Sequence, residues 1–192
     1  MKESTRLGQG AGFTLIEVTV VVAILGILVV ISIPNYLDWN RKAKLKDAVG
    51  LVSGDINLAR MNAINRNKSV TVTVTQPAVS SPVTVTFQVG GVNVVPPLTL
   101  DTEVSLTNAA NAVVGSGVNS PQDVLFTPMG LRNDTGNANN LCIDGVGVYT
   151  GAPCTNSSTQ AFNFNNTVGL NYRVVVTSAG KVSWCYTNNC AQ

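Results

Sequence analysis

The most unusual residue that could do chemistry in this chain is an acid inside a long apolar run. Residues 13–33 form 21 consecutive positions whose only polar members are Thr14, Glu17, Thr19 and Ser32. A helix of that length spans roughly 30 Å at about 1.5 Å per residue, which is enough to cross a bilayer. An ionised carboxylate in hydrocarbon costs about 2.5 to 3.5 kcal/mol on insertion scales, so such acids are usually paired or functional. Glu17 is therefore a candidate functional residue; the alternative is a carboxyl near the headgroups, protonated or hydrated.

The segment before the apolar run offers a partner for this acid. Residues 1–12 end in glycines, which leave the backbone extended and open to a protease. A cut after Gly12 would give Phe13 a new, positively charged α-amine. That amine could neutralise Glu17 within one chain or, on a neighbouring molecule, set the register of packing. Because no small-x-small cleavage site follows the run, we expect it to stay in the mature protein.

Enzyme chemistry has little support in this sequence. The chain has no histidine, which removes the commonest general base and metal ligand. It also lacks a Gly-rich phosphate loop and a nucleophile motif, and its acids are scattered singly. We therefore predict no catalytic residue, no metal site and no cofactor.

All the cysteines fall in the last third of the chain: Cys142, Cys154, Cys185 and Cys190. An even number of cysteines in a region rich in Thr, Asn and Gly predicts two disulfides in an oxidising compartment. A zinc site is the weaker alternative because no CxxC pair is present. Of the three connectivities, we favour Cys142 with Cys185 and Cys154 with Cys190. The pairs of sequence neighbours, Cys142 with Cys154 and Cys185 with Cys190, come next.

The rest of the chain must position these groups. After Pro34, apolar residues recur at spacings of three and four up to about Asn67, which predicts an amphipathic helix: Leu45, Ala48, Val52, Ile56, Ala59 and Ala63. From Ser69 the period changes to two, which predicts an antiparallel sheet with one face on that stripe. The expected fold class is α+β, a long N-terminal helix with an apolar transmembrane first half and an amphipathic second half packed on an antiparallel β-sheet head.

This organisation divides the chain into four expected parts. They are a cleaved leader (1–12), a transmembrane helix (13–33), an amphipathic helix (34–68) and a β-rich head that carries the disulfides (69–192). The positive-inside count would put the C-terminal side in the cytoplasm, whereas disulfides require an oxidising space. We give more weight to the cysteines and expect a single-pass inner-membrane protein with its head in the periplasm.

The stretch "GFTLIEVTVVVAILGILVVISIPNY" resembles the processing and assembly segment of type IV pilins and type II secretion pseudopilins. The resemblance implies cleavage after Gly12 by a prepilin peptidase, N-methylation of Phe13, and a filament whose core is made of apolar helices. It also implies that Glu17 meets a neighbour's amine, and that the helix loosens between Gly26 and Pro34 on assembly. Proline removes a helical hydrogen bond and glycine lowers helix propensity, which is consistent with that last point.

Three further segments are similar to the GspH/FimT group of minor pilins and pseudopilins: "INLARMNAINRNKSVTVTV", "VLFTPMGLRN" and "YRVVVTSAGKVSW", with Gly130 and Gly180 at turn positions. This resemblance implies a subunit of the initiation or tip complex of a type IV pilus or of a type II secretion pseudopilus. The implied partners are other pilin or pseudopilin subunits, the prepilin peptidase, the inner-membrane assembly platform, and membrane lipid before assembly. Pilus and pseudopilus are both open, since a processed length of 180 residues (192 less the 12-residue leader) fits either.

The alternative function is a pilus-borne binding module, an adhesin or a DNA-uptake receptor, suggested by long loops rich in Asn, Ser and Thr. Some members of the GspH/FimT group bind DNA through basic residues near the C-terminus. Here the C-terminal "SAGKVSWCYTNNCAQ" offers only Lys181, and the chain from Ser69 onward is net acidic. The attraction for phosphate that drives DNA binding is largely missing, so DNA is an unlikely partner.

Overall fold

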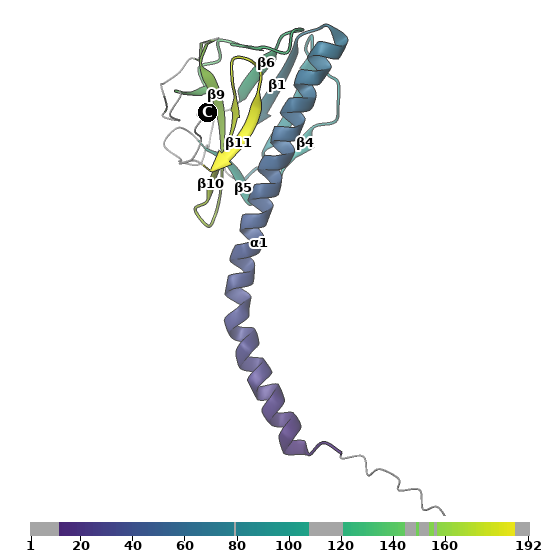
Figure 1. Cartoon of the computed structure of the whole chain (residues 1–192), viewed down its shortest axis with the longest axis vertical. Coiled ribbons are helices and arrows are strands. Elements are labelled where there is room, and N and C mark those ends of the chain that lie inside the picture. The colour runs from purple at the N-terminus through teal and green to yellow at the C-terminus, as the bar shows by residue number, and fades with distance from the viewer. Residues whose placement is uncertain are drawn as a thin grey trace, which may run out of the picture. The chain divides into compact units, whose positions relative to one another are not determined.

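The computed structural model describes residues 12–78, 80–107, 121–144, 149, 154–155 and 157–186. The chain forms two compact units, residues 1–39 and residues 40–192. One helix, α1 (Leu15–Arg66), contributes to both units, and all the strands belong to the second (Figure 1).

In the first unit, α1 is a helix without tertiary cover. Its N-terminus is capped by Thr14, whose Oγ1 accepts a hydrogen bond from the backbone N–H of Glu17 at 3.3 Å. Every side chain with a described burial between Gly12 and Trp39 is exposed. On length and hydropathy, no single helix of the described residues qualifies as a membrane span. The segments Leu15–Val30 and Asn35–Arg66 qualify as a candidate span only when they are taken together. The helix bends by 42° at the break between them.

In the second unit, α1 carries the apolar stripe that the sequence predicts. Its buried positions are at most 5% exposed and follow the expected spacing: Leu45, Ala48, Val49, Val52, Ile56, Ala59 and Ala63. The helix ends in a left-handed residue, Asn67, with φ of 50°. Lys68 donates its backbone N–H to the carbonyl of Ala63 at 3.2 Å, which satisfies one of the last free carbonyls.

The strands form two antiparallel sheets rather than the single sheet that the sequence predicts. The first has the order β3-β2-β1-β6-β7, with β4 paired to β2. Its strands are β1 (Val70–Thr75), β2 (Thr84–Val89), β3 (Val92–Asn93), β4 (Leu98–Thr99), β6 (Gln122–Phe126) and β7 (Arg132–Asn133). The second has the order β11-β10-β9-β5, with β8 paired to β9. Its strands are β5 (Val104–Thr107), β8 (Leu141–Ile143), β9 (Thr159–Asn166), β10 (Asn171–Val176) and β11 (Val182–Tyr186).

The two sheets arise because a segment with the alternation of a single strand is divided between them. The segment "LTLDTEVSLT" alternates like a single strand, but β4 and β5 belong to different sheets. Asp101 lies between them, and its Oδ1 accepts the backbone N–H of Glu103 at 3.0 Å. Val104 then donates its N–H to the carbonyl of Asp101 at 3.0 Å. This Asp-centred turn sends the chain from one sheet to the other.

Both sheets share one core with α1. On β1, Val70, Val72 and Val74 are fully buried, while the threonines between them face outward. Residues from β9 and β10, such as Phe162 and Val174, join the same apolar cluster as the α1 stripe. Figure 1 shows α1 running alongside the strands of the head. The predicted α+β class, a helix packed on antiparallel sheet, is confirmed.

Candidate assembly site

The first turn of α1 holds the acid that the sequence singles out. Phe13 and Glu17 line one shallow groove of about 270 Å³ together with Val18, Val21 and Val22. The Phe13 side chain is 80% exposed. Thr14 is the N-cap, and Glu17 stands at the third helical position, which is the sequence pattern of a capping box. The observed bond uses the backbone N–H of Glu17, and the Thr-x-x-Glu spacing that accompanies it was not considered at the level of sequence.

Gly12 is the first described residue and lies outside the helix; residues 1–11 of the predicted leader lie outside the described residues. The site therefore combines an exposed aromatic ring, an acid and an apolar wall. An acid at a helix N-terminus interacts favourably with the helix dipole, and it can accept hydrogen bonds from an ammonium group. Residues 12–39, the described part of the first unit, contain no lysine or arginine that could pair with Glu17.

The two positions predicted to loosen the helix lie farther along α1. Both residues lie within the bounds of α1, but Pro34 falls in the break between Val30 and Asn35 at which the helix bends by 42°, whereas Gly26 lies before it. A Cβ atom at Gly26 would meet nothing within 4 Å, so no packing contact requires a glycine there. Loosening of this segment on assembly stays a prediction, as do the cleavage after Gly12 and the methylation of Phe13.

A charged cluster holds the start of the second unit's helix against the β4–β5 turn. Lys44 Nζ lies 3.1 Å from Asp101 Oδ2 and 3.3 Å from Glu103 Oε2, and Arg41 Nε lies 3.9 Å from Glu103 Oε1. The hydrogen bond to Asp101 raises the pKa of Lys44. The backbone N–H of Glu103, and then Lys44, lower the pKa of Asp101. From the β9 side, Asn166 Nδ2 donates to the carbonyl of Arg41 at 3.1 Å.

Arg60 joins two equivalent turns to the helix. One turn is Thr127–Leu131, in which the N–H of Gly130 donates to the Thr127 carbonyl at 2.8 Å; the other is Thr177–Lys181, in which Gly180 makes the same bond at 2.9 Å. Arg60 Nε donates to the carbonyl of Gly130 at 2.8 Å, and Nη2 donates to that of Ala179 at 3.2 Å.

Both turn glycines have positive φ, 73° at Gly130 and 76° at Gly180, as their predicted turn positions require. A Cβ atom on Gly180 would overlap the carbonyl oxygen of Gly130. The N–H of Arg132 also donates to the carbonyl of Ser178 at 3.1 Å. The sequence predicts the two turns, but it shows neither their contact with each other nor the role of Arg60 in holding them.

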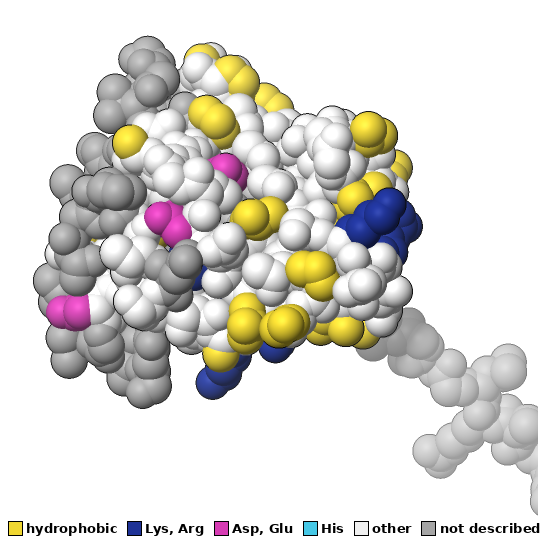
Figure 2. Space-filling view, turned by 90° about the horizontal axis from the view of Figure 1, so that it is seen from above, with side chains coloured by type: hydrophobic (Ala, Val, Ile, Leu, Met, Phe, Trp, Pro, Cys, Tyr) yellow, Lys and Arg dark blue, Asp and Glu magenta, His cyan; other side chains and the backbone are white. Residues whose placement is uncertain are grey.

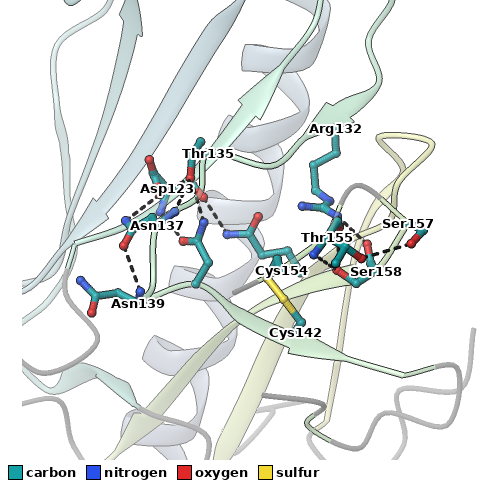
Figure 3. Close-up of a disulfide and its surroundings, with 12 residues drawn as sticks. Asp123, Arg132, Thr135, Asn137, Asn139, Cys142, Cys154, Thr155, Ser157 and Ser158 are labelled. Carbon is teal, nitrogen blue, oxygen red and sulfur yellow. Dashed lines mark hydrogen bonds between the residues drawn. A yellow bond between two sulfur atoms is a disulfide. The ribbon is translucent and has the colours of Figure 1, made fainter. Parts of the chain in front are cut away.

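The observed disulfide joins Cys142 to Cys154 (Figure 3). The favoured pairing of Cys142 with Cys185 is therefore wrong. Cys142 lies on β8 and Cys185 on β11, and the register places β9 and β10 between these strands. Three strand spacings amount to roughly 14 Å, about twice the Cα separation that a disulfide can bridge. Cys185 is also disulfide-bonded, and Cys190 lies outside the described residues.

Polar contacts surround this disulfide without forming a reactive site. Arg132 Nη2 donates to the carbonyls of Thr155 and Ser158, at 2.5 and 2.6 Å. Asp123 Oδ1 accepts hydrogen bonds from Thr135 Oγ1 at 2.9 Å and Asn137 Nδ2 at 2.7 Å (Figure 3). Across the described residues, no group of three or more Cys, Asp or Glu side chains is placed to hold a metal ion.

The described residues thus combine an exposed apolar helix with a helix-backed, disulfide-bonded β head. A family model described as type II transport protein GspH matches residues 48–180. The chain belongs to this GspH family, within the type IV pilin and pseudopilin superfamily and its GspH/FimT group of minor pilins. Proteins of this kind are structural subunits and not enzymes.

Individual relatives match over shorter segments. The type IV major pilin protein PilE1 of Neisseria gonorrhoeae is 37% identical over 57 residues, which are 30% of this chain and 34% of PilE1. A fimbrial protein of Pseudomonas aeruginosa is 44% identical over 59 residues, 31% of this chain and 38% of that protein. The chain thus spans about a third of the length of the curated relatives it matches. The crystal structure of the type IV minor pilin FimU of Pseudomonas aeruginosa covers 77% of this chain and 92% of FimU, at 10% identity and a TM-score of 0.46.

Proposed function

We propose that this protein is a minor pilin or pseudopilin that a prepilin peptidase cuts after Gly12 and methylates at Phe13. The cut subunit is held in the inner membrane by α1, as a single-pass protein with its head in the periplasm. The assembly platform then moves it from lipid into the initiation or tip complex of a type IV pilus or of a type II secretion pseudopilus. Its partners in that complex are other pilin or pseudopilin subunits.

One observation carries the proposal: Glu17, the only acid among residues 13–33, lies on the exposed apolar part of α1, four residues after Phe13. Inside the bilayer and without a partner, the ionised carboxylate of Glu17 makes insertion of the helix less favourable. A positive α-amine on the Phe13 of a neighbouring subunit would offset that cost and select one axial register. The observed N-cap bond is the competing explanation, because a capping role would also favour an acid at this position.

Two substitutions separate the two explanations. Glutamine also suits the third helical position of a capping box, so Glu17→Gln keeps the cap and removes only the charge. We expect Glu17→Gln and Glu17→Ala both to leave membrane insertion intact and to lose incorporation into filaments, measured by immunoblot of sheared filaments against the membrane fraction. Normal incorporation of Glu17→Gln would contradict a role for the charge. Mass spectrometry of the mature N-terminus tests the cut after Gly12 directly.

The alternative function, a pilus-borne binding module, stays a prediction. Of the two loops that suggest it, residues 108–120 lie outside the described residues. The second, expected over residues 150–169, is not a loop throughout, because it contains the largely buried strand β9. No described feature favours it over the structural role.

A further inference from the structure

The second sheet ends at β11, which has a strand on one side only among the described residues. In the turn before it, the N–H of Thr177 donates to the carbonyl of Lys181 at 3.0 Å. Hydrogen-bonded and non-hydrogen-bonded pairs alternate from that closing pair. Ser183 therefore bonds to β10, whereas Val182 and Trp184 turn their N–H and C=O groups away from β10. No described residue makes a hydrogen bond to these outward groups, so the edge can pair with another extended backbone.

A groove lies beside this edge, between β11 and α1. A Cβ atom at Gly50 or at Gly54 would meet nothing within 4 Å, so the floor of the groove is helix backbone open to an approaching group. Leu51, which is 56% exposed, and Trp184, which is 40% exposed, give it apolar walls. We call this feature the α1 groove. Its volume is about 580 Å³, and seven residues line it: Lys46, Asp47, Gly50, Leu51, Gly54, Asp55 and Trp184.

The position of the α1 groove suits one more strand. Figure 1 shows β11 running alongside α1. A strand added to β11 would lie about 4.8 Å from it, over the part of α1 where Gly50 and Gly54 leave room. The groove carries one cation, Lys46, and two acids, Asp47 and Asp55, so charge selects little. The open backbone groups and the apolar walls therefore determine what binds, namely an extended segment with apolar or neutral side chains.

β11 lacks features that commonly protect an edge strand. Its sequence, VSWCY, contains no charged residue and no proline. Trp184 and Tyr186 contact Tyr172 of β10 edge to face, with ring centroids 5.7 and 5.6 Å apart. On the face of the head that Figure 2 views from above, apolar side chains are scattered over a mostly uncharged surface, which is usual for proteins. The edge beside α1 differs because it combines an aromatic surface with open backbone groups.

We propose that the α1 groove binds an extended segment of a different pilin-type subunit, which adds to β11 as one further strand. The inference rests on the proposed function, because it concerns a contact within the initiation or tip complex. A second copy of this chain fits less well. Pairing of β11 with itself about a twofold axis would be antiparallel, and the two α1 helices beside these strands would then run in opposite directions. Subunits held in one membrane by α1 point the same way.

Photo-cross-linking of the full-length protein in its native membranes and filaments tests the contact. Trp184→benzoylphenylalanine keeps an aromatic ring at the α1 groove and adds a photoreactive group. We expect a covalent adduct with another pilin-type subunit, and mass spectrometry identifies the joined segment. The matched control is Val92→benzoylphenylalanine, since Val92 is 68% exposed on β3, the edge strand of the other sheet. This control should not give the same adduct.

Cysteine scanning then shows whether the joined segment is a strand. Trp184→Cys is combined with single cysteines along the segment of the partner. Successive side chains of a strand point to opposite faces, so disulfides should form at every second position. Disulfides at spacings of three and four would indicate a docked helix and overturn the inference.

Filling the floor of the groove gives an independent readout. In the photo-cross-linking background, Gly54→Phe should lower the adduct yield about tenfold, because its ring occupies the place of the added strand. Gly54→Ala should keep most of the yield. Both variants should fold, since a Cβ at this position meets nothing within 4 Å and both residues have a higher helix propensity than glycine. An unchanged yield in Gly54→Phe would show that the partner does not lie over α1.

The outcomes separate this inference from the proposed function. If Glu17→Gln blocks incorporation but the probe at position 184 gives no adduct, the inference is wrong while the proposed function stands. The same holds if the probe joins only a second copy, residues of its own chain or lipid. If the adduct with another pilin-type subunit forms while Glu17→Gln is incorporated normally, the role of the charge is wrong and the added strand is supported.

Discussion

Replacement of Gly180 by alanine tests the contact between the two turns of the head. Gly180 has φ of 76°, a backbone conformation that costs about 1–2 kcal/mol for an ordinary L-residue. Its added Cβ would also overlap the carbonyl oxygen of Gly130, which is backbone and cannot rotate away. The two turns must then separate, and the hydrogen bonds from Arg60 are weakened; a hydrogen bond to a charged group contributes about 1.5–3 kcal/mol. We expect a total loss of about 3–5 kcal/mol in the free energy of unfolding.

Gly169→Ala is the matched control. Gly169 has φ of 80°, but a Cβ there would meet nothing within 4 Å. Only the conformational cost of about 1–2 kcal/mol applies to this variant. Urea denaturation of both variants in detergent, followed by tryptophan fluorescence, gives the two free energies and checks that the slopes agree. Equal losses in the two variants would refute the view that the turns are packed against each other through Gly180.

Three further changes test other contacts. Cys154→Ser should lower the free energy of unfolding by about 3 kcal/mol, measured by urea denaturation, because its bridge to Cys142 closes a loop with a sequence separation of 12; an unchanged midpoint would contradict a stabilising role. Asp101 has a lowered pKa in the folded protein, so its stabilising effect is present above its unfolded pKa and is lost as the pH falls through the folded pKa. Asp101→Asn should therefore slightly reduce the acid-induced loss of stability, an effect that should shrink in 1 M salt since the pair with Lys44 is exposed. Arg60→Lys keeps the charge but should lower the thermal unfolding midpoint, because a single ammonium group cannot donate to the carbonyls of both Gly130 and Ala179 as the guanidinium does. A wild-type midpoint would argue against this two-turn contact.

The helix and the strand periods could be predicted because each reflects burial on one face. The spacing of three and four from Leu45 to Ala63 matches the buried stripe of α1, and the alternation in β1 matches its buried valines. Local patterns of this kind depend only on which side of an element meets the core. Glu17 stood out for a similar reason, since one acid in an apolar run is visible without any knowledge of the fold.

Features that depend on which strands are neighbours could not be read in the same way. Cysteine spacing does not reveal that β9 and β10 separate β8 from β11, so the preferred disulfide pairing was wrong. The alternation through Asp101 looks continuous, although the chain changes sheets there. Arg60 looks like one more solvated cation in the sequence. Its two acceptors, the carbonyls of Gly130 and Ala179, come 70 and 119 residues later in the chain.

The position of α1 at the start of the chain affects the timing of folding. The stripe that begins at Leu45 is completed by β10, whose Val176 lies in the same core. Some 130 residues must follow Leu45 before that partner exists, which at roughly 5–20 residues per second takes about 6–26 s of synthesis. Throughout that interval the apolar stripe of α1 lacks part of the core that covers it. On the proposed route to the periplasm, we therefore expect this stripe to stay incompletely covered until β10 has been translocated as well.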